Sequence, residues 1–186
     1  MAAELRDGFK FRSGHLALDL PATVVGRSTP VPTDLLGSAQ DLDRWLVAAG
    51  LAARVPGASA RNLEPARALR ESLYRLGLAA AGRRGFRAED VAILNRIALP
   101  TPPTPQLQGR RAVWVPHGVD SLLASIARAG VELLGGESAH RVRACAGTGC
   151  SILFFDGSRS GDRRWCSMTA CGNRAKLAEF RKRGRR

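Results

Sequence analysis

CAGTGCSILFFDGSRSGDRRWCSMTAC, residues 145–171, contains all four cysteines of this 186-residue chain. They form two pairs of equal spacing, Cys145-x4-Cys150 and Cys166-x4-Cys171, separated by fifteen residues. Each pair can close a turn that brings two thiolates to one ion, and the loop between the pairs lets them meet, as tetrahedral zinc requires. We therefore predict that these four cysteines bind one Zn²⁺ per chain.

Other interpretations of the cysteines stay open at this stage. Four thiolates can hold an iron–sulfur cluster, the cysteines can be free and buried, or the thiolates can report oxidation as a redox sensor. A disulfide scaffold fits less well, because residues 1–144 lack cysteine and the start MAAELRDGFKFRSG has no apolar stretch typical of a secretion signal. Clustered cysteines in a reducing compartment are more often metal ligands than disulfides.

A site made only of cysteines predicts a structural role for the metal. A catalytic zinc keeps one coordination position open and usually has His or a carboxylate among its ligands. The rest of the chain has no nucleophile–base signature, phosphate-binding loop or HExxH motif. We therefore expect a protein that is not an enzyme.

Positive charge is concentrated at the C-terminal end of the chain. The whole sequence has 29 Lys+Arg and 16 Asp+Glu, a formal net charge of +13. Residues 141–186 hold 12 basic and 3 acidic residues, so this quarter of the chain contributes +9 and residues 1–140 only +4. The asymmetry favours a polyanionic partner; a solvated basic face without a partner is the alternative.

The segment after Cys171 reads GNRAKLAEFRKRGRR and is rich in helix formers up to Arg183, with a frayed tail beyond. A basic helix anchored by zinc is a common way to approach a phosphate backbone or enter a groove. Asn173 has two interpretations, an adenine contact or a helix cap, of which we favour the cap. The candidate nucleic-acid contacts are Arg163, Arg164, Asn173, Arg174, Lys176, Arg181 and Lys182.

DNA is the expected partner, and an RNA- or ribosome-associated module is the alternative. Single-stranded RNA is recognised by stacking on aromatic side chains, so exposure of Trp165 or Phe154 would favour RNA. We expect these aromatics to pack instead in a miniature core with their neighbours Ile152, Leu153, Phe155 and Met168. One finger rarely makes enough specific contacts, so a homodimer is expected as well.

Apolar spacing in the first part of the chain predicts four helices, within residues 38–50, 62–82, 88–99 and 119–134. Ser38 or Asp41 is the expected cap of the first helix, and Asn62 is the expected cap of the second. A short strand is expected at His15–Leu20, paired with residues 111–116, while the proline-rich residues 99–109 are expected to form a long surface loop. The expected class is α+β. Residues 1–138 form a mostly helical domain with a small strand pair, and residues 139–186, here called the cysteine module, end in a helix.

The sequence resembles a known family. Arg163-Arg164-Trp165-Cys166-Ser167-Met168 followed by Cys171-Gly172-Asn173-Arg174 resembles the signature of CGNR zinc fingers, and HLALDL at 15–20 resembles the opening motif of the ABATE domain. The resemblance implies a stress-induced transcription regulator whose N-terminal domain senses an unknown ligand or signal. The family motif usually continues into Val-Asn-Thr, whereas this chain has Pro21-Ala22-Thr23.

These inferences together predict a zinc-dependent, DNA-binding transcription regulator in which residues 1–138 sense a signal or dimerise. No apolar run approaches the 18 or so residues of a membrane span. We therefore expect a cytoplasmic protein, associated with the nucleoid when it binds DNA.

Overall fold

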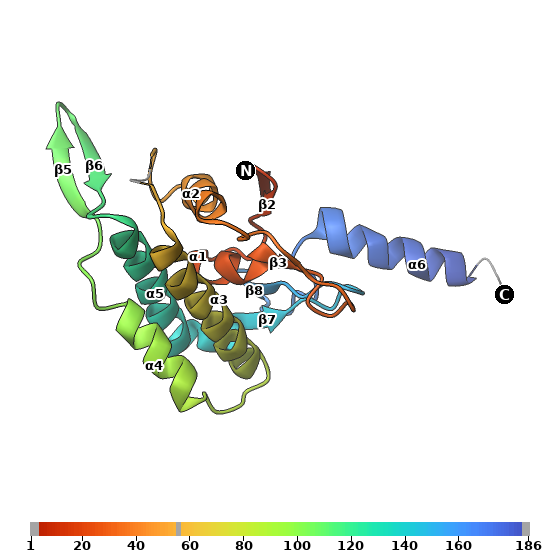
Figure 1. Cartoon of the computed structure of the whole chain (residues 1–186). Coiled ribbons are helices and arrows are strands. Elements are labelled where there is room, and N and C mark those ends of the chain that lie inside the picture. Colours follow the sequence, from red (N-terminus) through yellow and green to blue (C-terminus); the bar gives the residue numbers. More distant parts are fainter. Residues whose placement is uncertain (1–3, 55–56, 184–186) are drawn as a thin grey trace.

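A computed structural model describes residues 4–54 and 57–183 of the chain. Helices dominate it, and the strands form separate antiparallel pairs (Figure 1). The predicted α+β class is confirmed, with a mostly helical first part and a final helix beside the four cysteines. The helical elements are α1 (Leu16–Asp19), η1 (Leu20–Thr23), α2 (Ala39–Ala48), α3 (Ala60–Ala81), α4 (Ala88–Ile97), α5 (Val119–Gly135), η2 (Glu137–Arg141), η3 (Met168–Gly172) and α6 (Asn173–Arg183).

The strands are short and pair locally. The four described pairs are β1 (Leu5–Arg6) with β2 (Phe9–Lys10), β3 (Val24–Val25) with β4 (Thr33–Asp34), β5 (Thr104–Gln108) with β6 (Arg111–Val115), and β7 (Val142–Ala144) with β8 (Leu153–Phe155).

No described helix is both long and apolar enough to cross a membrane.

The main core lies between helices α1 to α5, where α3 packs against α4 and α5 and α1 packs against α5. Trp45 of α2, Leu69 of α3 and Leu122 of α5 are completely buried in it. All four predicted helices are present, because their apolar residues recur at helical spacing and face this core.

Capping residues set the starts of two of these helices. Ser38 caps α2 together with Asp41, each side chain bonding the other's backbone N–H, as predicted for this helix start. At α3 the predicted cap, Asn62, is wrong by three residues. Ser59 is the N-cap, and the Asn62 side chain accepts a hydrogen bond from the Ser59 N–H at 3.0 Å. Both starts are capping boxes.

The predicted strand at His15–Leu20 is wrong, because the segment is helical. It forms α1 and continues directly into η1, and His15 Nδ1 caps α1 by accepting a hydrogen bond from the N–H of Ala17 at 3.3 Å. Every residue from Ala17 to Thr23 is buried. A short run that is buried on all sides has no polar face to show its period, so its pattern does not separate strand from helix.

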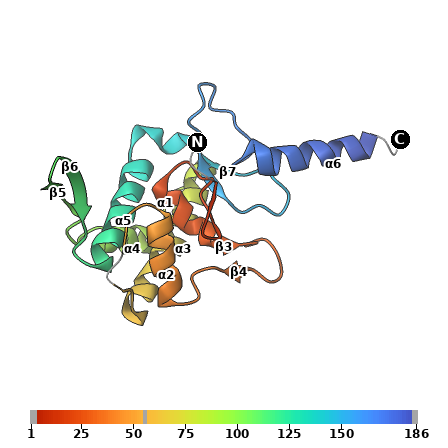
Figure 2. The ribbon, with the colours of Figure 1, turned by 90° about the horizontal axis from the view of Figure 1, so that it is seen from above.

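The proline-rich segment is a loop only in part, because Thr104–Gln108 forms β5. The strand at residues 111–115 therefore pairs with its neighbour in sequence and not with His15–Leu20. Proline lacks the N–H that a central strand needs, but an isolated hairpin consists of edge strands only, where Pro105 is tolerated. This hairpin projects from the body at the end opposite α6 (Figures 1 and 2).

One face of this hairpin is apolar. Its register places Pro105 opposite Trp114 and Leu107 opposite Ala112, so all four side chains share one face of the pleat. Leu107 is 78% exposed and Trp114 is 64% exposed. Exposed apolar surface of this kind typically marks an interaction site.

The cysteine module shares a core with the helical part. Four residues from both sides of the predicted boundary form one buried cluster: Leu18, Leu133, Val142 and Leu153. A Cβ atom on Gly77 of α3 would lie 2.6 Å from Leu153 Cδ1, so only glycine allows this close approach. The backbone N–H of Phe155 also donates to the Ser13 carbonyl at 2.7 Å.

Asp19 is a buried acid at the centre of this arrangement, with only 8% of its surface exposed. Its Oδ1 accepts a hydrogen bond from the Ser13 N–H at 3.2 Å. Burial raises the pKa of Asp19 to about 6, although hydrogen bonds from Ser13 and the charge of Arg6 act against the rise. The folded protein therefore binds the Asp19 proton more tightly than the unfolded chain does.

We expect Asp19 to lower the stability of the fold as the pH rises. Its pKa is about 6 when folded, against an ordinary value of 3.8, so raising the pH from 5 to 7.5 should cost about 1 kcal/mol through this group. Urea unfolding of Asp19→Asn at both pH values should give a free energy of unfolding that lacks this loss. An unchanged pH dependence would mean that Asp19 is already ionised in the folded protein at pH 5.

Candidate metal centre and nucleic-acid surface

The four cysteines come from three segments that the local fold brings to one point. Cys145 and Cys150 lie in the turn between β7 and β8, Cys166 follows the long loop after β8, and Cys171 lies in η3 just before α6. All four Sγ atoms lie within 4.8 Å of one another. The cluster therefore joins the hairpin to the base of α6.

The cluster fits a tetrahedral zinc ion. Zn–S bonds of about 2.3 Å at tetrahedral angles place sulfurs about 3.8 Å apart. The Sγ of Cys166 lies 3.8 Å from that of Cys171 and 3.9 Å from that of Cys150. Four thiolates fill the coordination shell, and such closed sites fix structure.

Because the thiols are crowded together, their pKa values move apart. Hydrogen bonds from Cys150 and Cys166 hold the pKa of Cys145 far below its ordinary value. The same hydrogen bond to Cys145 raises the pKa of Cys150 to about 11, and the pKa of Cys166 is raised further by Cys145 and Cys150. Because zinc binds thiolates, loading the centre releases protons, and its affinity falls as the pH falls.

Gly147 permits the first cysteine pair to wrap around the centre. A Cβ atom there would lie 3.0 Å from both Cβ and Sγ of Cys171. Its N–H donates to Cys145 Sγ at 3.4 Å. A larger residue at this position would therefore press against the ligand Cys171.

Asp156 organises the loop that leads to the third cysteine. It is completely buried, and its carboxylate accepts hydrogen bonds from the backbone N–H of Ser158 at 3.0 Å and of Arg163 at 2.8 Å. Burial alone would raise its pKa, but these hydrogen bonds and the Arg163 charge outweigh burial and lower it. The carboxylate thus fixes the loop through the backbone of Arg163 and not through its guanidinium.

The predicted miniature core forms only in part. Ile152 and Phe154 are buried in one cluster beside the cysteines, and Trp165 packs against it partly buried. Leu153 and Phe155 pack instead toward the helical part, and Met168 is 47% exposed with its sulfur over Gly172. Phe154 is therefore not a base-stacking group, which weakens the RNA alternative.

Comparison with known families decides where the chain belongs. The ABATE model, described as "Putative stress-induced transcription regulator", matches residues 14–137, about two thirds of the chain. The chain belongs to the ABATE family. The CGNR zinc finger model matches residues 141–184, so the four-cysteine cluster is a zinc site for one ion. No curated protein matches the chain.

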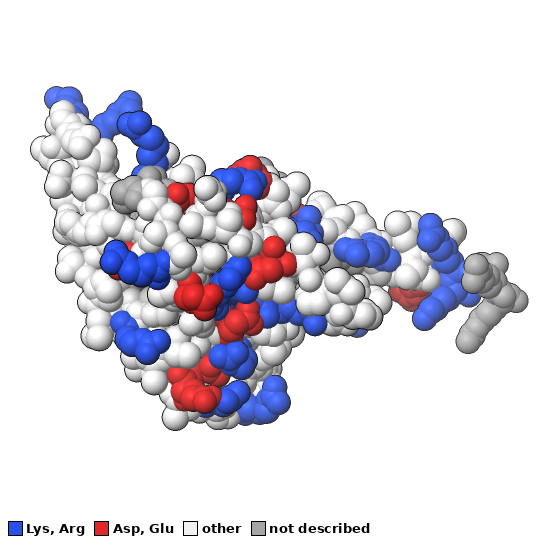
Figure 3. Space-filling view, in the orientation of Figure 1, with Lys and Arg blue, Asp and Glu red and all other residues white. Residues whose placement is uncertain are grey.

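Helix α6 carries most of the predicted nucleic-acid contacts of this ABATE protein. None of its residues is buried, and Lys and Arg side chains are distributed along it (Figure 3). Over the body, by contrast, basic and acidic groups are interleaved (Figure 3). The structure brings together on this helix Arg174, Lys176, Arg181 and Lys182, and the frayed tail predicted beyond Arg183 lies outside the described residues.

The two remaining arginines of the predicted set fold back onto the module. Arg163 Nη2 donates to the Cys166 carbonyl at 3.0 Å, and its guanidinium lies 5.1 Å from the Phe154 ring centre. The Arg164 guanidinium lies 5.2 Å from the Trp165 ring centre. Both are exposed, but their contacts within the module give them a structural role near the zinc.

Asn173 is not the cap that we favoured. Ser167 caps the turn that leads into α6 by accepting a hydrogen bond from the Ala170 N–H. Asn173 is exposed, and its side chain makes no hydrogen bond within residues 4–54 and 57–183. The amide thus lies at the first position of α6 and is accessible to a ligand.

The sequence alone did not reveal that the N-terminal hairpin reaches the cysteine module. Glu4 accepts hydrogen bonds from the Ser167 hydroxyl at 2.8 and 3.0 Å, and it faces Arg12 at 3.1 Å. In FKFR, residues 9–12, Phe9 is buried while Lys10 and Arg12 alternate with the aromatics. That alternation was the available signal that two cations lie on one face.

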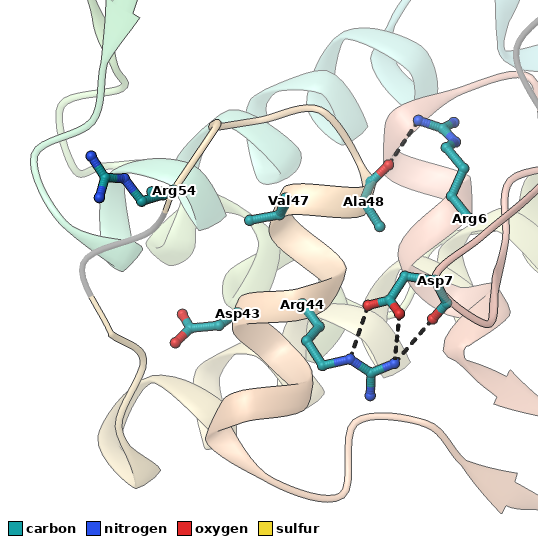
Figure 4. Close-up of a pocket in the computed structure, with 7 residues that line it drawn as sticks. All are labelled: Arg6, Asp7, Asp43, Arg44, Val47, Ala48 and Arg54. Carbon is teal, nitrogen blue, oxygen red and sulfur yellow. Dashed lines mark hydrogen bonds and ion pairs between the residues drawn. The ribbon is translucent and has the colours of Figure 1, made fainter.

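A separate hollow of about 520 Å³ lies on the ABATE protein beside α2. Figure 4 shows that two of the arginines that line it, Arg6 and Arg44, are already engaged by the chain. Arg44 pairs with Asp7 at 2.9 Å and Arg6 donates to the Ala48 carbonyl at 2.7 Å. Asp43 accepts from the Ala58 N–H at 2.9 Å. These groups support structure and leave little for a charged ligand.

We expect Gly147→Ala to weaken zinc binding roughly tenfold or more, because the added Cβ pushes against a ligand. Competition with a chromophoric chelator measures this affinity. Gly157→Ala in the same module is the matched control, since its Cβ would meet only the Phe155 ring at 3.7 Å, an ordinary contact. Equal zinc affinities for the two variants would show that the turn around Gly147 yields without cost.

Proposed function

We propose that this protein is a zinc-dependent, DNA-binding transcription regulator. The observation that carries the proposal is the position of α6, which starts at the zinc cluster and extends away from the body (Figures 1 and 2). Zinc would fix the direction of the helix through Cys171, and the helix would present its basic side chains to the duplex.

The physical chemistry of α6 supports this role. A helix of 11 residues with no buried face gains little from packing, and isolated helices of that length are marginal in water. Five of its residues are basic and one, Glu179, is acidic. Contact with a polyanion would relieve the repulsion between the cations and add phosphate contacts. We therefore assign Arg174, Lys176, Arg181 and Lys182 to the backbone and leave Asn173 for a base edge.

We assign residues 1–138 to regulation and residues 139–186 to zinc and DNA. The regulatory part would sense a signal or dimerise. Dimerisation is supported by the exposed apolar face of the β5–β6 hairpin, with Leu107 and Trp114. Catalysis is not part of the proposal, since a four-thiolate centre leaves zinc no open position. The proposed location is the cytoplasm, at the nucleoid when DNA is bound.

Selection of the zinc-loaded protein against a random duplex library at near-physiological salt tests sequence-specific binding. We expect an enriched motif, and two-fold symmetry within it would indicate a dimer. Uniform recovery of the library, with zinc confirmed in the protein, would contradict a sequence-specific regulator.

Removing cations from the far half of α6 should weaken duplex binding without loss of zinc. For Arg181→Gln with Lys182→Gln, we expect the slope of log affinity against log salt to fall by up to about 1.8, because each phosphate that the helix no longer neutralises lowers it by about 0.9. The matched control is Arg110→Gln with Arg111→Gln, at the tip of the hairpin opposite α6. Equal slopes for the two double variants would remove α6 from the interface.

A further inference from the structure

A groove of about 290 Å³ runs along the seam between the N-terminal part and the cysteine module. One wall comes from β2, η1 and β3, and the other from the turn of the first cysteine pair and the start of α6. Three cations line it: Lys10, Arg12 and Arg174. We call this cavity the seam groove. None of the seven predicted nucleic-acid residues except Arg174 lies in it.

Arg12 is the central observation. Its side chain is only 20% exposed, yet its guanidinium makes no hydrogen bond within the described residues. Nε lies 3.1 Å from a Glu4 carboxylate oxygen but is buried without a hydrogen-bond partner. The Glu4 carboxylate thus forms an ion pair with Arg12, and it also accepts a hydrogen bond from the Ser167 hydroxyl. Because a largely buried guanidinium has five N–H donors to satisfy, Arg12 is suited to an anion that enters the groove.

The other groups lining the groove add to this capacity. Lys10 is partly buried and has no ion-pair partner among the described residues. Ser151 is partly buried too, and its hydroxyl makes no hydrogen bond there either. Nη2 of the Arg174 guanidinium donates to Cys171 Sγ at 3.9 Å. That contact leaves most N–H donors of Arg174 free. These donors come from both sides of the seam.

The seam groove differs in this respect from the larger hollow beside α2. There Arg44 is paired with the Asp7 carboxylate and Arg6 is bonded to the Ala48 carbonyl (Figure 4). In the seam groove no carboxylate is among the described lining residues, and Glu4 is the one acid paired with a lining cation there. The small apolar side chains of Ala22, Val24 and Val25 also line the groove. The result is a narrow cationic cavity with a partly apolar wall.

We propose that the seam groove binds a phosphate group, held by Lys10, Arg12 and Arg174 together. Arginine forks match phosphate geometry, and lysine adds a point charge. The group comes from a small phosphorylated molecule or from the backbone of bound nucleic acid. In both cases the ligand ties the N-terminal hairpin to the base of α6. A ligand in the groove thereby sets the position or the net charge of α6. This consequence rests on the proposed function, in which α6 contacts DNA.

The competing role of the three cations is to neutralise the zinc thiolates. Four thiolates and one Zn²⁺ carry a formal charge of about −2, and Arg174 is within reach of one sulfur. That role predicts loss of zinc when the cations are removed. A phosphate site predicts loss of phosphate binding with zinc retained.

The test uses the zinc-loaded full chain and the variant Lys10→Gln with Arg12→Gln. Arg110→Gln with Arg111→Gln is the control, with the same change in charge at a distant site. Titration calorimetry with inorganic pyrophosphate probes a small ligand, and the salt slope for a random-sequence duplex probes the backbone. Thr29→Glu, an exposed residue on the groove wall, places a carboxylate there while it keeps both cations.

A small-molecule source predicts saturable pyrophosphate binding to wild type and control, with affinity at least roughly tenfold lower in the Lys10/Arg12 variant and in Thr29→Glu. A nucleic-acid source predicts no pyrophosphate binding but a salt slope lower by about 0.9 to 1.8 in the Lys10/Arg12 variant alone. Either result supports the site.

Equal pyrophosphate affinities and equal salt slopes in all proteins overturn the proposal. Release of zinc from the Lys10/Arg12 variant also overturns it, because that result assigns the cations to the thiolates. If wild-type protein binds no duplex, the proposed DNA-binding function fails, and the pyrophosphate titration alone then decides the groove.

Discussion

The convergence of four sulfur atoms on one point is the constraint that orders the C-terminal quarter of this protein. Cysteines from both ends of a 27-residue segment must meet within 4.8 Å, and the β7–β8 hairpin, the buried Asp156 loop and the base of α6 all serve that meeting. The crowding of these sulfur atoms lowers the pKa of Cys145 and raises that of Cys150. A module this small buries too little apolar surface to fold alone, so binding of the metal supplies much of its stability.

Most of the helical architecture was predictable, because the apolar residues of α2 to α5 recur at helical spacing and face one core. The strand predictions failed for two physical reasons. Residues 17–23 are buried on every side, so their pattern contains no alternation from which a period can be read. The prolines at 102–105 suggested a loop, but an isolated hairpin consists of edge strands and accepts proline without loss of a ladder bond.

The metal ligands were predictable because their chemistry and spacing lie in one short segment. The seam groove was not, because its residues are more than 160 positions apart, as Lys10 and Arg174 are, and nothing local indicates that they meet. Asn173 shows a related limit. Its residue type suits both a cap and a base contact, and only the observed Ser167 cap removes the first role.

The cluster of Leu18, Leu133, Val142 and Leu153 has a consequence for how such proteins can be built. A finger that stands on a flexible linker can be cut out and fused to another protein. Here excision would uncover Val142 and Leu153, which the helical part normally covers, and Gly77 would lose the side chain that packs on it. The finger and the helical part are therefore tied to each other's surfaces, and exchanging one between relatives requires matched residues on both sides of the seam.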